Sequence, residues 1–156
     1  MGFTEVKAYL DTEGYGDRVT EFTVSSATVE LAAQALSCEP RRIAKSLSFM
    51  LGEEPILVVT AGDAKVDNAK YKAKFGKKAK MLTPDEVVQF IGHAIGGECP
   101  FAVNDGVTVY LDESLKRFST VFPACGSSNS AIELTIPELE EHSGFTEWVD
   151  VCKGWE

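Results

Sequence analysis

The sequence lacks the patterns that identify several large classes of protein. No apolar run approaches the roughly 20 residues that a membrane-spanning helix needs, so we expect no membrane protein and no membrane partner. The first residues, MGFTEVKAYLDTEG, have no apolar stretch of the kind found in signal peptides, which predicts a cytoplasmic location. The 156 residues suffice for one core. We therefore expect a single domain over residues 1–156.

The common catalytic and metal-binding motifs are also missing. The four cysteines show no C-x-x-C spacing, which predicts reduced thiols. The two histidines lie far apart and belong to no metal-ligand pattern, so we expect neither a metal nor another cofactor. There is no G-x-S-x-G motif, and neither histidine has an obvious nucleophile beside it. A Ser-His-Asp triad is therefore hard to build from this chain.

Positive charge is scarce except in one segment. The net charge of −9 argues against wrapping of nucleic acid by the whole surface. However, the stretch from Lys65 to Lys80 holds seven of the 15 basic residues and a single acidic residue, Asp67. This segment is either a solvated helix face that aids solubility or a surface that contacts a phosphate backbone.

Helix and strand signals alternate along the first part of the chain. Apolar residues at helical spacing, together with capping residues and glycine stops, predict helices. Alternating and continuous β-branched runs predict strands. In order, we expect a helix over 3–10, a strand near 19–23, a helix capped by Ser26, central strands over 43–51 and 56–61, a lysine-rich helix from Asp67 to Gly76, and a helix that begins with the capping box Thr83–Glu86 and ends at Gly92.

The remainder of the chain reads mainly as short strands. The stretches FAV, VTVYL, TVFPA and AIELT are rich in β-forming residues and are separated by turns, which predicts antiparallel hairpins. A second capping box at Thr135–Glu138 predicts a last acidic helix that closes at Gly144. The expected fold class is α+β, with a mixed β-sheet that curls toward a barrel and is flanked by helices.

Three features could carry chemistry. Lys45 stands on the apolar side of a strand that looks buried, so its side chain either reaches solvent at an edge or acts as a fixed cation in a pocket. The glycine-rich loop over 92–103 is either a tight connector or a site where backbone N–H groups approach a ligand. Cys99 and Cys125 lie in glycine-rich turns and are either buried apolar groups or nucleophiles of a cysteine hydrolase.

Taken together, four segments resemble the YbaK and prolyl-tRNA synthetase-associated editing domain family. They are RRIAKSLSF, GHAIGGECPF, VYLDESLKRF and FPACGSSNSAIELTIPEL, in this order. The resemblance implies a curled mixed sheet and hydrolysis of the ester between a wrongly attached small amino acid and tRNA. It also implies substrate-assisted chemistry without a cofactor, in which Lys45 is the key polar residue and the loop from Gly96 to Pro100 lies beside the ester.

The resemblance extends to further residues and partners. It implies that Lys45 positions the substrate, and that N–H groups of Gly96 and Gly97 stabilise the oxyanion. The partners expected are the acceptor end of a mischarged tRNA and a synthetase, with no DNA. Substrate contacts are expected from Phe22, Ser46, Cys99, Pro100, Phe101, Gly126 and Ser127, and tRNA contacts from Lys65, Lys70, Lys72, Lys74, Lys77 and Lys78.

Two departures from the family pattern leave the amino acid open. Ala102 stands where relatives often carry glycine, and GSSNSAI lacks a basic residue often found after the matching glycine. Cysteinyl-tRNA(Pro) is the first substrate to test, followed by alanyl- and seryl-tRNA, since a pocket discriminates one methylene by only about 1–3 kcal/mol. The alternative is a non-catalytic module of the same fold that binds tRNA or a synthetase.

Overall fold

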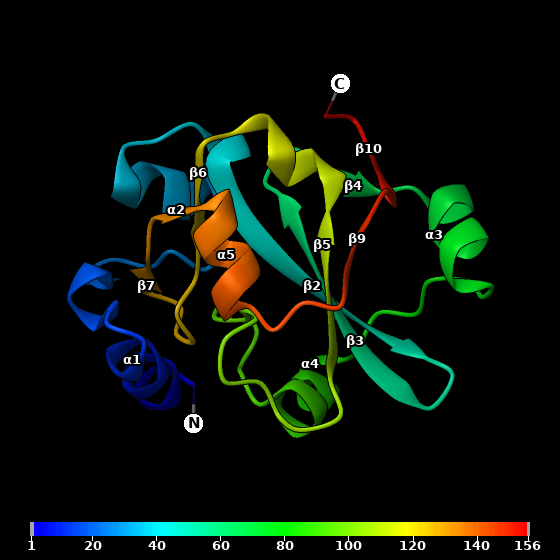
Figure 1. The fold of residues 1–156 in the computed structure, drawn as a ribbon, viewed down its shortest axis with the longest axis horizontal. Helices are drawn as coiled ribbons and strands as arrows, with labels where there is room; N and C mark the ends of the chain where they lie inside the picture. The colour runs from blue at the N-terminus through cyan, green and yellow to red at the C-terminus, as the bar shows by residue number, and fades with distance from the viewer. Residues whose placement is uncertain (1, 156) are drawn as a thin grey trace.

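The fold is built around one six-stranded mixed sheet (Figure 1). A computed structural model describes residues 2–155. From edge to edge the strands are β8 (Leu134–Thr135), β6 (Thr120–Pro123), β2 (Ile43–Leu51), β3 (Glu54–Ala61), β5 (Thr108–Asp112) and β9 (Glu147–Val149). Two short ribbons accompany the sheet, formed by β1 (Thr20–Glu21) with β7 (Ser130–Ala131) and by β4 (Lys65–Val66) with β10 (Cys152–Lys153).

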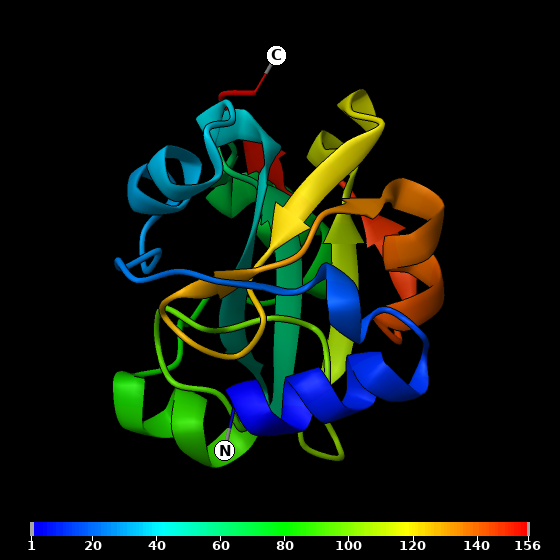
Figure 2. The ribbon, with the colours of Figure 1, turned by 90° about the vertical axis from the view of Figure 1, so that its left-hand side faces the viewer.

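Helices surround this sheet, and Figure 2 shows its strands fanning out and curling between them. The helices are α1 (Phe3–Thr12), α2 (Val29–Leu36), α3 (Asn68–Phe75), α4 (Pro84–Glu86) and α5 (Ile136–His142). Helix α4 continues into a π-helical turn (Val87–Ile91), and 3-10 turns cover Gly16–Arg18, Pro40–Arg42 and Glu113–Arg117. Within residues 2–155 no helix combines the length and apolar character that crossing a bilayer requires. The expected α+β class with a curled mixed sheet is confirmed.

Strands β2 and β3 form the centre of the sheet, as the sequence predicts. They pair antiparallel from Ala44 opposite Ala61 to Leu51 opposite Glu54. Every residue of β3 from Ile56 to Ala61 is buried, because helices or loops cover both faces of this β-branched run. The side chains of β2 alternate, with Ser48 on one face and Phe49 packed against Tyr71 of α3 on the other.

Local capping signals fix several helix ends. Asp67 accepts a hydrogen bond from the Lys70 N–H at the start of α3, and Gly76 ends that helix in the left-handed conformation. The capping boxes predicted at residues 83–86 and 135–138 are both formed. One predicted cap is wrong. The side chain that caps α2 belongs to Thr28, which accepts from the Leu31 N–H, and Ser26 lies before the helix.

The prediction of antiparallel hairpins after Pro100 is wrong in part. Strand β5 pairs parallel with β3, and β6 pairs parallel with β2, because each follows its partner only after a long connection that returns the chain to the same edge. Residues 101 and 102 form a turn and residue 103 has no regular structure, so the strand predicted there does not form. The antiparallel expectation holds for β6 with β8. All four cysteines are free thiols, as predicted.

Candidate active site

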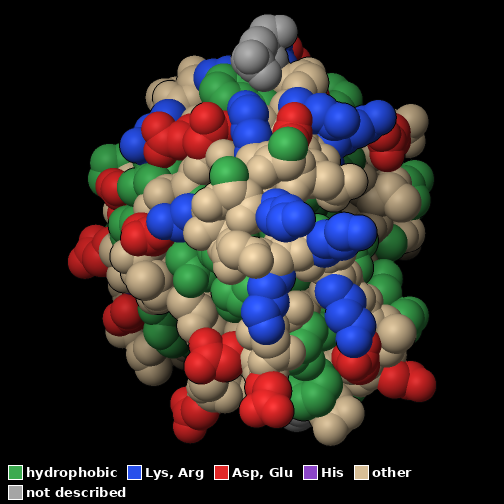
Figure 3. Space-filling view, turned by 90° about the vertical axis from the view of Figure 1, so that its right-hand side faces the viewer, with side chains coloured by type: hydrophobic (Ala, Val, Ile, Leu, Met, Phe, Trp, Pro, Cys, Tyr) green, Lys and Arg blue, Asp and Glu red, His purple; other side chains and the backbone are tan. Residues whose placement is uncertain are grey.

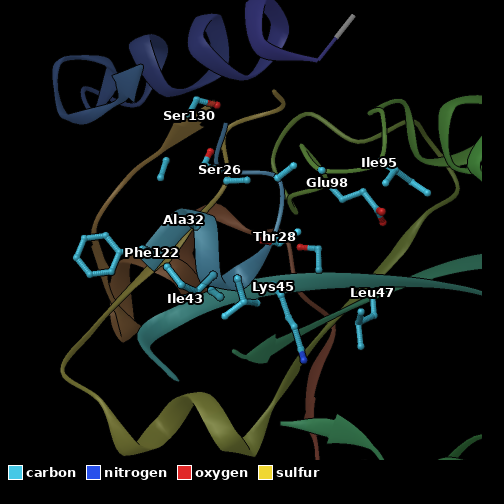
Figure 4. A pocket seen from close by; sticks show the side chains of 17 residues that line it. Ser26, Thr28, Ala32, Ile43, Lys45, Leu47, Ile95, Glu98, Phe122 and Ser130 are labelled. Carbon is cyan, nitrogen blue, oxygen red and sulfur yellow. The ribbon is translucent and has the colours of Figure 1, made fainter. Parts of the chain in front are cut away.

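A cavity of about 250 Å³ lies against the edge of β2 (Figure 4). Segments far apart in the sequence form its walls: the approach to α2, strand β2, the glycine-rich loop, and the chain around β6 and β7. Lys45 and Gly96, both expected at the site, line it together with Ser46. Tertiary packing therefore assembles a site from residues that the sequence separates widely.

The cavity exists because one edge of β2 is only partly paired. Strand β6 pairs with Ile43 and Ala44 and goes no further along β2. Beyond the gap, the Leu82 N–H donates to the Ser48 carbonyl at 3.1 Å. Since backbone groups alternate in direction along a strand, those of Ser46 point to the same edge as those of Ser48. The N–H and C=O groups of Ser46 therefore face the gap that the cavity fills.

Lys45 is half-buried at the border of this cavity. Its Nζ donates one long hydrogen bond, 3.5 Å, to the carbonyl oxygen of Gly62. Figure 4 shows the side chain extending to the opposite side of β2 from Ser26 and Ser130. Burial lowers the pKa of the Lys45 ammonium below its usual value, while Asp63 counteracts this effect. An ammonium has three donors, so Lys45 can still bind an anionic or carbonyl oxygen.

Two serine hydroxyls of the cavity wall have no hydrogen-bond partner in residues 2–155. The Oγ atoms of Ser26 and Ser46 are both buried, and Ser26 is only 7% exposed. A buried hydroxyl without a partner costs roughly 1–3 kcal/mol. Because both oxygen atoms have almost no exposed surface, a polar ligand in the cavity would reach them only if the wall shifts, and they leave this wall with polar groups that the protein does not compensate.

The two glycines expected to act on the ester have different positions. Gly96 lines the cavity in a left-handed conformation, with φ +92°. Gly97 does not line it, and its N–H already donates to the Ala94 carbonyl at 3.0 Å. A Cβ on Gly97 would lie 2.6 Å from the backbone nitrogen of Ser127. This placement gives no support to the role predicted for the Gly97 N–H, which stays a prediction, and it shows that this glycine allows two loops to pack closely.

The second glycine-rich turn lies behind the cavity wall. Phe22 and Asn129 exchange two hydrogen bonds, of 2.7 and 3.0 Å, that tie this turn to the chain before α2. Ser127 Oγ lies 2.6 Å from the Oγ of Ser130, which does line the cavity. The structure therefore places Phe22, Gly126 and Ser127 as supports of the wall rather than on its surface.

The residues after Glu98 turn away from the cavity. Cys99 and Phe101 are fully buried, and Pro100 borders a second hollow on the other side of the loop. Burial raises the pKa of the Cys99 thiol to about 12, and burial likewise raises that of Cys125. A protonated, inaccessible thiol is a poor nucleophile, which argues against a cysteine hydrolase. Contact between the substrate and Cys99 or Phe101 is not supported by this placement.

Buried His93 holds this part of the loop in place. Its Nε2 donates to the Phe101 carbonyl at 2.8 Å, and burial lowers the pKa of the imidazole. Phe101 is followed by Ala102, whose φ of 52° is the left-handed conformation that glycine adopts most easily. This backbone geometry accounts for the glycine expected at that position.

Glu98 is a charged residue of the cavity wall for which the sequence predicted no role of its own, although it belongs to the loop expected beside the ester. It extends from the glycine-rich loop toward β2, where its Oε2 accepts a hydrogen bond of 2.9 Å from the Ser48 hydroxyl. Burial raises the pKa of the Glu98 carboxyl, and the Ser48 hydrogen bond counteracts this effect. An acidic residue inside a glycine-rich loop was the available signal, but spacing alone could not show which way it points.

The lysine-rich segment forms an exposed basic surface on the side of the molecule that carries α3 (Figure 3). Lys70 and Lys74 form ion pairs there with Asp150 and Glu147, respectively. The other lysines expected to contact tRNA form no ion pair within the described part of the chain; these are Lys65, Lys72, Lys77 and Lys78.

Comparison with known proteins gives consistent matches. The family model described as an aminoacyl-tRNA editing domain matches residues 23–142, a span that includes every residue lining the cavity. The uncharacterized protein YwhH of Bacillus subtilis is 55% identical over 157 residues, covering all of both chains. A crystal structure described as a candidate trans-editing enzyme for prolyl-tRNA synthetase is 32% identical, with a TM-score of 0.86 over 97% of this chain and 96% of that one.

Proline–tRNA ligases match over part of their length. The enzyme of Lactiplantibacillus plantarum is 24% identical over 135 residues, which are 86% of this chain and 22% of the ligase. The enzyme of Halalkalibacterium halodurans is 31% identical over 109 residues, which are 69% of this chain and 19% of the ligase. The chain thus spans about a fifth of the length of these ligases.

Proposed function

The chain belongs to the aminoacyl-tRNA editing domain family, and we propose that it hydrolyses tRNA esters of wrongly attached small amino acids, acting in trans to the synthetase. The observation that carries this proposal is the cavity at the β2 edge. Its wall contains unpaired backbone and hydroxyl groups beside Lys45, and within residues 2–155 none of the hydroxyls that line it is hydrogen-bonded to a histidine or a carboxylate. Such a wall suits binding and orientation of an ester more than covalent catalysis.

In the proposed reaction, water attacks the ester carbonyl and the 3′-oxygen of the terminal ribose departs with a proton. The backbone N–H groups of Gly96 and Ser46 are candidates to stabilise the oxyanion. Within the described chain, neither N–H group donates a hydrogen bond to an acceptor on the cavity side. Lys45 positions the ester or the phosphate of the terminal nucleotide. A ribose hydroxyl of the substrate takes part in the proton transfer.

The cavity favours a small aminoacyl group. Its volume of about 250 Å³ lies below the roughly 300–1,000 Å³ usual for pockets of drug-sized ligands. Small side chains such as Ala27, Ala124 and Ala131 form much of its wall. Cysteinyl-tRNA(Pro) remains our first candidate, followed by alanyl- and seryl-tRNA. All three are tested because their side chains differ little in size, and a pocket discriminates poorly between side chains of similar size.

The basic surface around α3 supports a role for the lysines in holding tRNA. Lys65 lies close enough to Lys45 to lower its pKa by charge repulsion, which connects the basic segment with the cavity border. Contacts to phosphates would depend on salt and not on sequence. A synthetase that releases the mischarged tRNA is the expected protein partner, and the cytoplasm is the expected location.

A panel of mischarged tRNAs tests this function. Wild-type protein is incubated with cysteinyl-, alanyl- and seryl-tRNA(Pro) and with correctly charged prolyl-tRNA, and release of amino acid is compared with that by Lys45→Met. We expect the substitution to slow release from the preferred ester by at least about 100-fold, the effect of losing one key polar group in an active site. Its Tm should not fall, because replacing a half-buried ammonium by an apolar side chain removes a desolvation cost.

The alternative, a binding module of the same fold, makes a different prediction. It would bind mischarged tRNA without releasing amino acid from any of these esters. Release at equal rates by wild type and Lys45→Met would also contradict the proposed function.

A further inference from the structure

The chemistry proposed above leaves Glu98 without a role. This carboxylate belongs to the cavity wall, and within residues 2–155 it forms a single hydrogen bond, which its Oε2 accepts from the Ser48 hydroxyl at 2.9 Å. Ser48 itself is only 3% exposed, so it holds the carboxylate in a fixed place. The second oxygen, Oε1, has no partner within residues 2–155 and remains available to the cavity.

A half-buried carboxylate needs compensation that the protein supplies only in part. No Lys, Arg or His lies within ion-pair distance of Glu98 in the described residues. Burial accordingly raises the pKa of its carboxyl. A cationic group entering the cavity would both neutralise the carboxylate and donate to Oε1.

The two charged side chains of the cavity wall, Glu98 and Lys45, project to different places. Glu98 comes from the glycine-rich loop and approaches the β2 face that carries Ser48, whereas Lys45 extends on the other face (Figure 4). An aminoacyl ester of tRNA has a matching arrangement, with an α-ammonium on the amino acid and phosphates on the nucleotide. The α-amino group is the cation that every such ester carries, whatever its side chain.

Resting on the proposed function, we infer that Glu98 is a specificity-determining residue that binds the substrate's free α-ammonium group through the oxygen not held by Ser48. The site therefore selects aminoacyl esters with an unmodified amino group. Esters in which this group is acylated or replaced by a neutral group are poor substrates, even when their carbonyl and nucleotide are identical.

The test compares alanyl-tRNA with lactyl-tRNA, in which a hydroxyl of similar size replaces the α-ammonium. Seryl-tRNA and glyceryl-tRNA provide a second matched pair. Rates of wild type, Glu98→Gln and Lys45→Met are each divided by the spontaneous hydrolysis rate of the same ester, because the ammonium itself activates the ester. Glu53→Gln, a substitution in the exposed β2–β3 turn, is the control for loss of one negative charge.

We expect wild type and Glu53→Gln to prefer the amino ester over its hydroxy analogue by about 10- to 100-fold, the usual contribution of a charge-assisted hydrogen bond. In Glu98→Gln this preference should fall to about threefold or less, chiefly through slower hydrolysis of the amino ester. In Lys45→Met both esters should be affected alike. A circular dichroism melt shows whether Glu98→Gln remains folded, and Glu98→Asp should restore part of the preference.

The remaining outcomes contradict the inference in distinguishable ways. If Glu98→Gln slows both esters equally, Glu98 acts on the reaction itself, for example as a base for water, and does not read the ammonium. If Glu98→Gln prefers the amino ester as strongly as wild type does, and wild type hydrolyses that ester, the inference is wrong but the proposed function stands. If wild type hydrolyses neither amino ester nor any other in the panel, the proposed function and the inference are both overturned.

Discussion

Two hollows of nearly equal size border the same glycine-rich loop, and they differ in chemistry. The cavity at the β2 edge has a volume of about 250 Å³ and the second hollow one of about 230 Å³. Gly96 and Glu98 face the first, whereas Pro100 and Ala102 face the second. The loop thus separates two spaces that volume alone would not distinguish.

The polar groups of the second hollow are largely satisfied within the protein. The Tyr9 hydroxyl donates to the His142 carbonyl at 2.9 Å, and the His142 Nδ1 lies 3.2 Å from a carboxylate oxygen of Glu13. Ser143 Oγ is the one hydroxyl bordering this hollow that is buried without a partner in the described chain. The β2 cavity instead combines two such hydroxyls with an open strand edge, a lysine and a glutamate. Unpaired polar groups, rather than space, distinguish the candidate site.

Filling each hollow in turn is the strongest test of this comparison. Ala27→Phe places a ring at the β2 cavity from an exposed backbone position, and Val107→Phe does so at the second hollow. We expect Ala27→Phe to slow deacylation by about 100-fold, because misplacing the ester by about 1 Å has an effect of this size. Val107→Phe should stay within about twofold of wild type, since its site is separate. Equal losses in the two variants would remove the distinction between the hollows.

Substitution of Gly97 tests whether loop packing shapes the cavity. Gly97→Ala brings a methyl group against the backbone of residues 126–127, so the loops must separate. We expect the free energy of unfolding to fall by about 1–3 kcal/mol and the deacylation rate by about 10-fold. The matched control is Gly106→Ala, where no atom lies within 4 Å of the added Cβ. It should destabilise through its positive φ alone and retain activity.

Salt dependence tests whether the basic surface serves the β2 cavity. The double variant Lys72→Ala/Lys77→Ala removes two lysines without acidic partners in residues 2–155, and Lys70→Ala/Lys74→Ala removes two that are ion-paired. The logarithm of tRNA affinity is measured against the logarithm of salt concentration. Loss of two free lysines should make this slope shallower by roughly 1.4–1.8. Loss of the two ion-paired lysines should change the slope by less than half as much. An equal change in the two double variants would show that the ion pairs do not keep Lys70 and Lys74 from binding phosphates.

The pH dependence of stability tests how His93 holds the loop between the hollows. Burial keeps the folded-state pKa of His93 below the ordinary 6.5. Below about pH 6.5 the unfolded chain therefore takes up a proton that the folded protein does not, and stability falls as the pH falls. Chemical denaturation from pH 7 to pH 5 should show a steeper loss for wild type than for His93→Gln, by up to about 1.4 kcal/mol per pH unit. The raised pKa of Glu98 acts in the opposite direction in both proteins, so the difference isolates His93.

Much of the fold was predictable because its signals are local. The capping boxes at residues 83–86 and 135–138 each satisfy backbone N–H groups within three residues, and the β-branched run of β3 requires cover on both faces. The parallel pairing of β5 with β3 was missed, since no short turn encodes it. Ser26 was misassigned as a cap because Thr28, two residues later, is an equally suitable residue type.

By itself, the sequence determined most of the segments that form helices and strands, on which face of β2 Lys45 lies, and to which family the chain belongs. Only the tertiary structure decided that Gly96 and Glu98 face the cavity while Gly97 and Cys99 face the interior. The reason is physical. Local hydrogen bonds and side-chain alternation act over a few residues, whereas the direction of a glycine-rich loop depends on the distant backbone against which it packs, here that of Gly126 and Ser127.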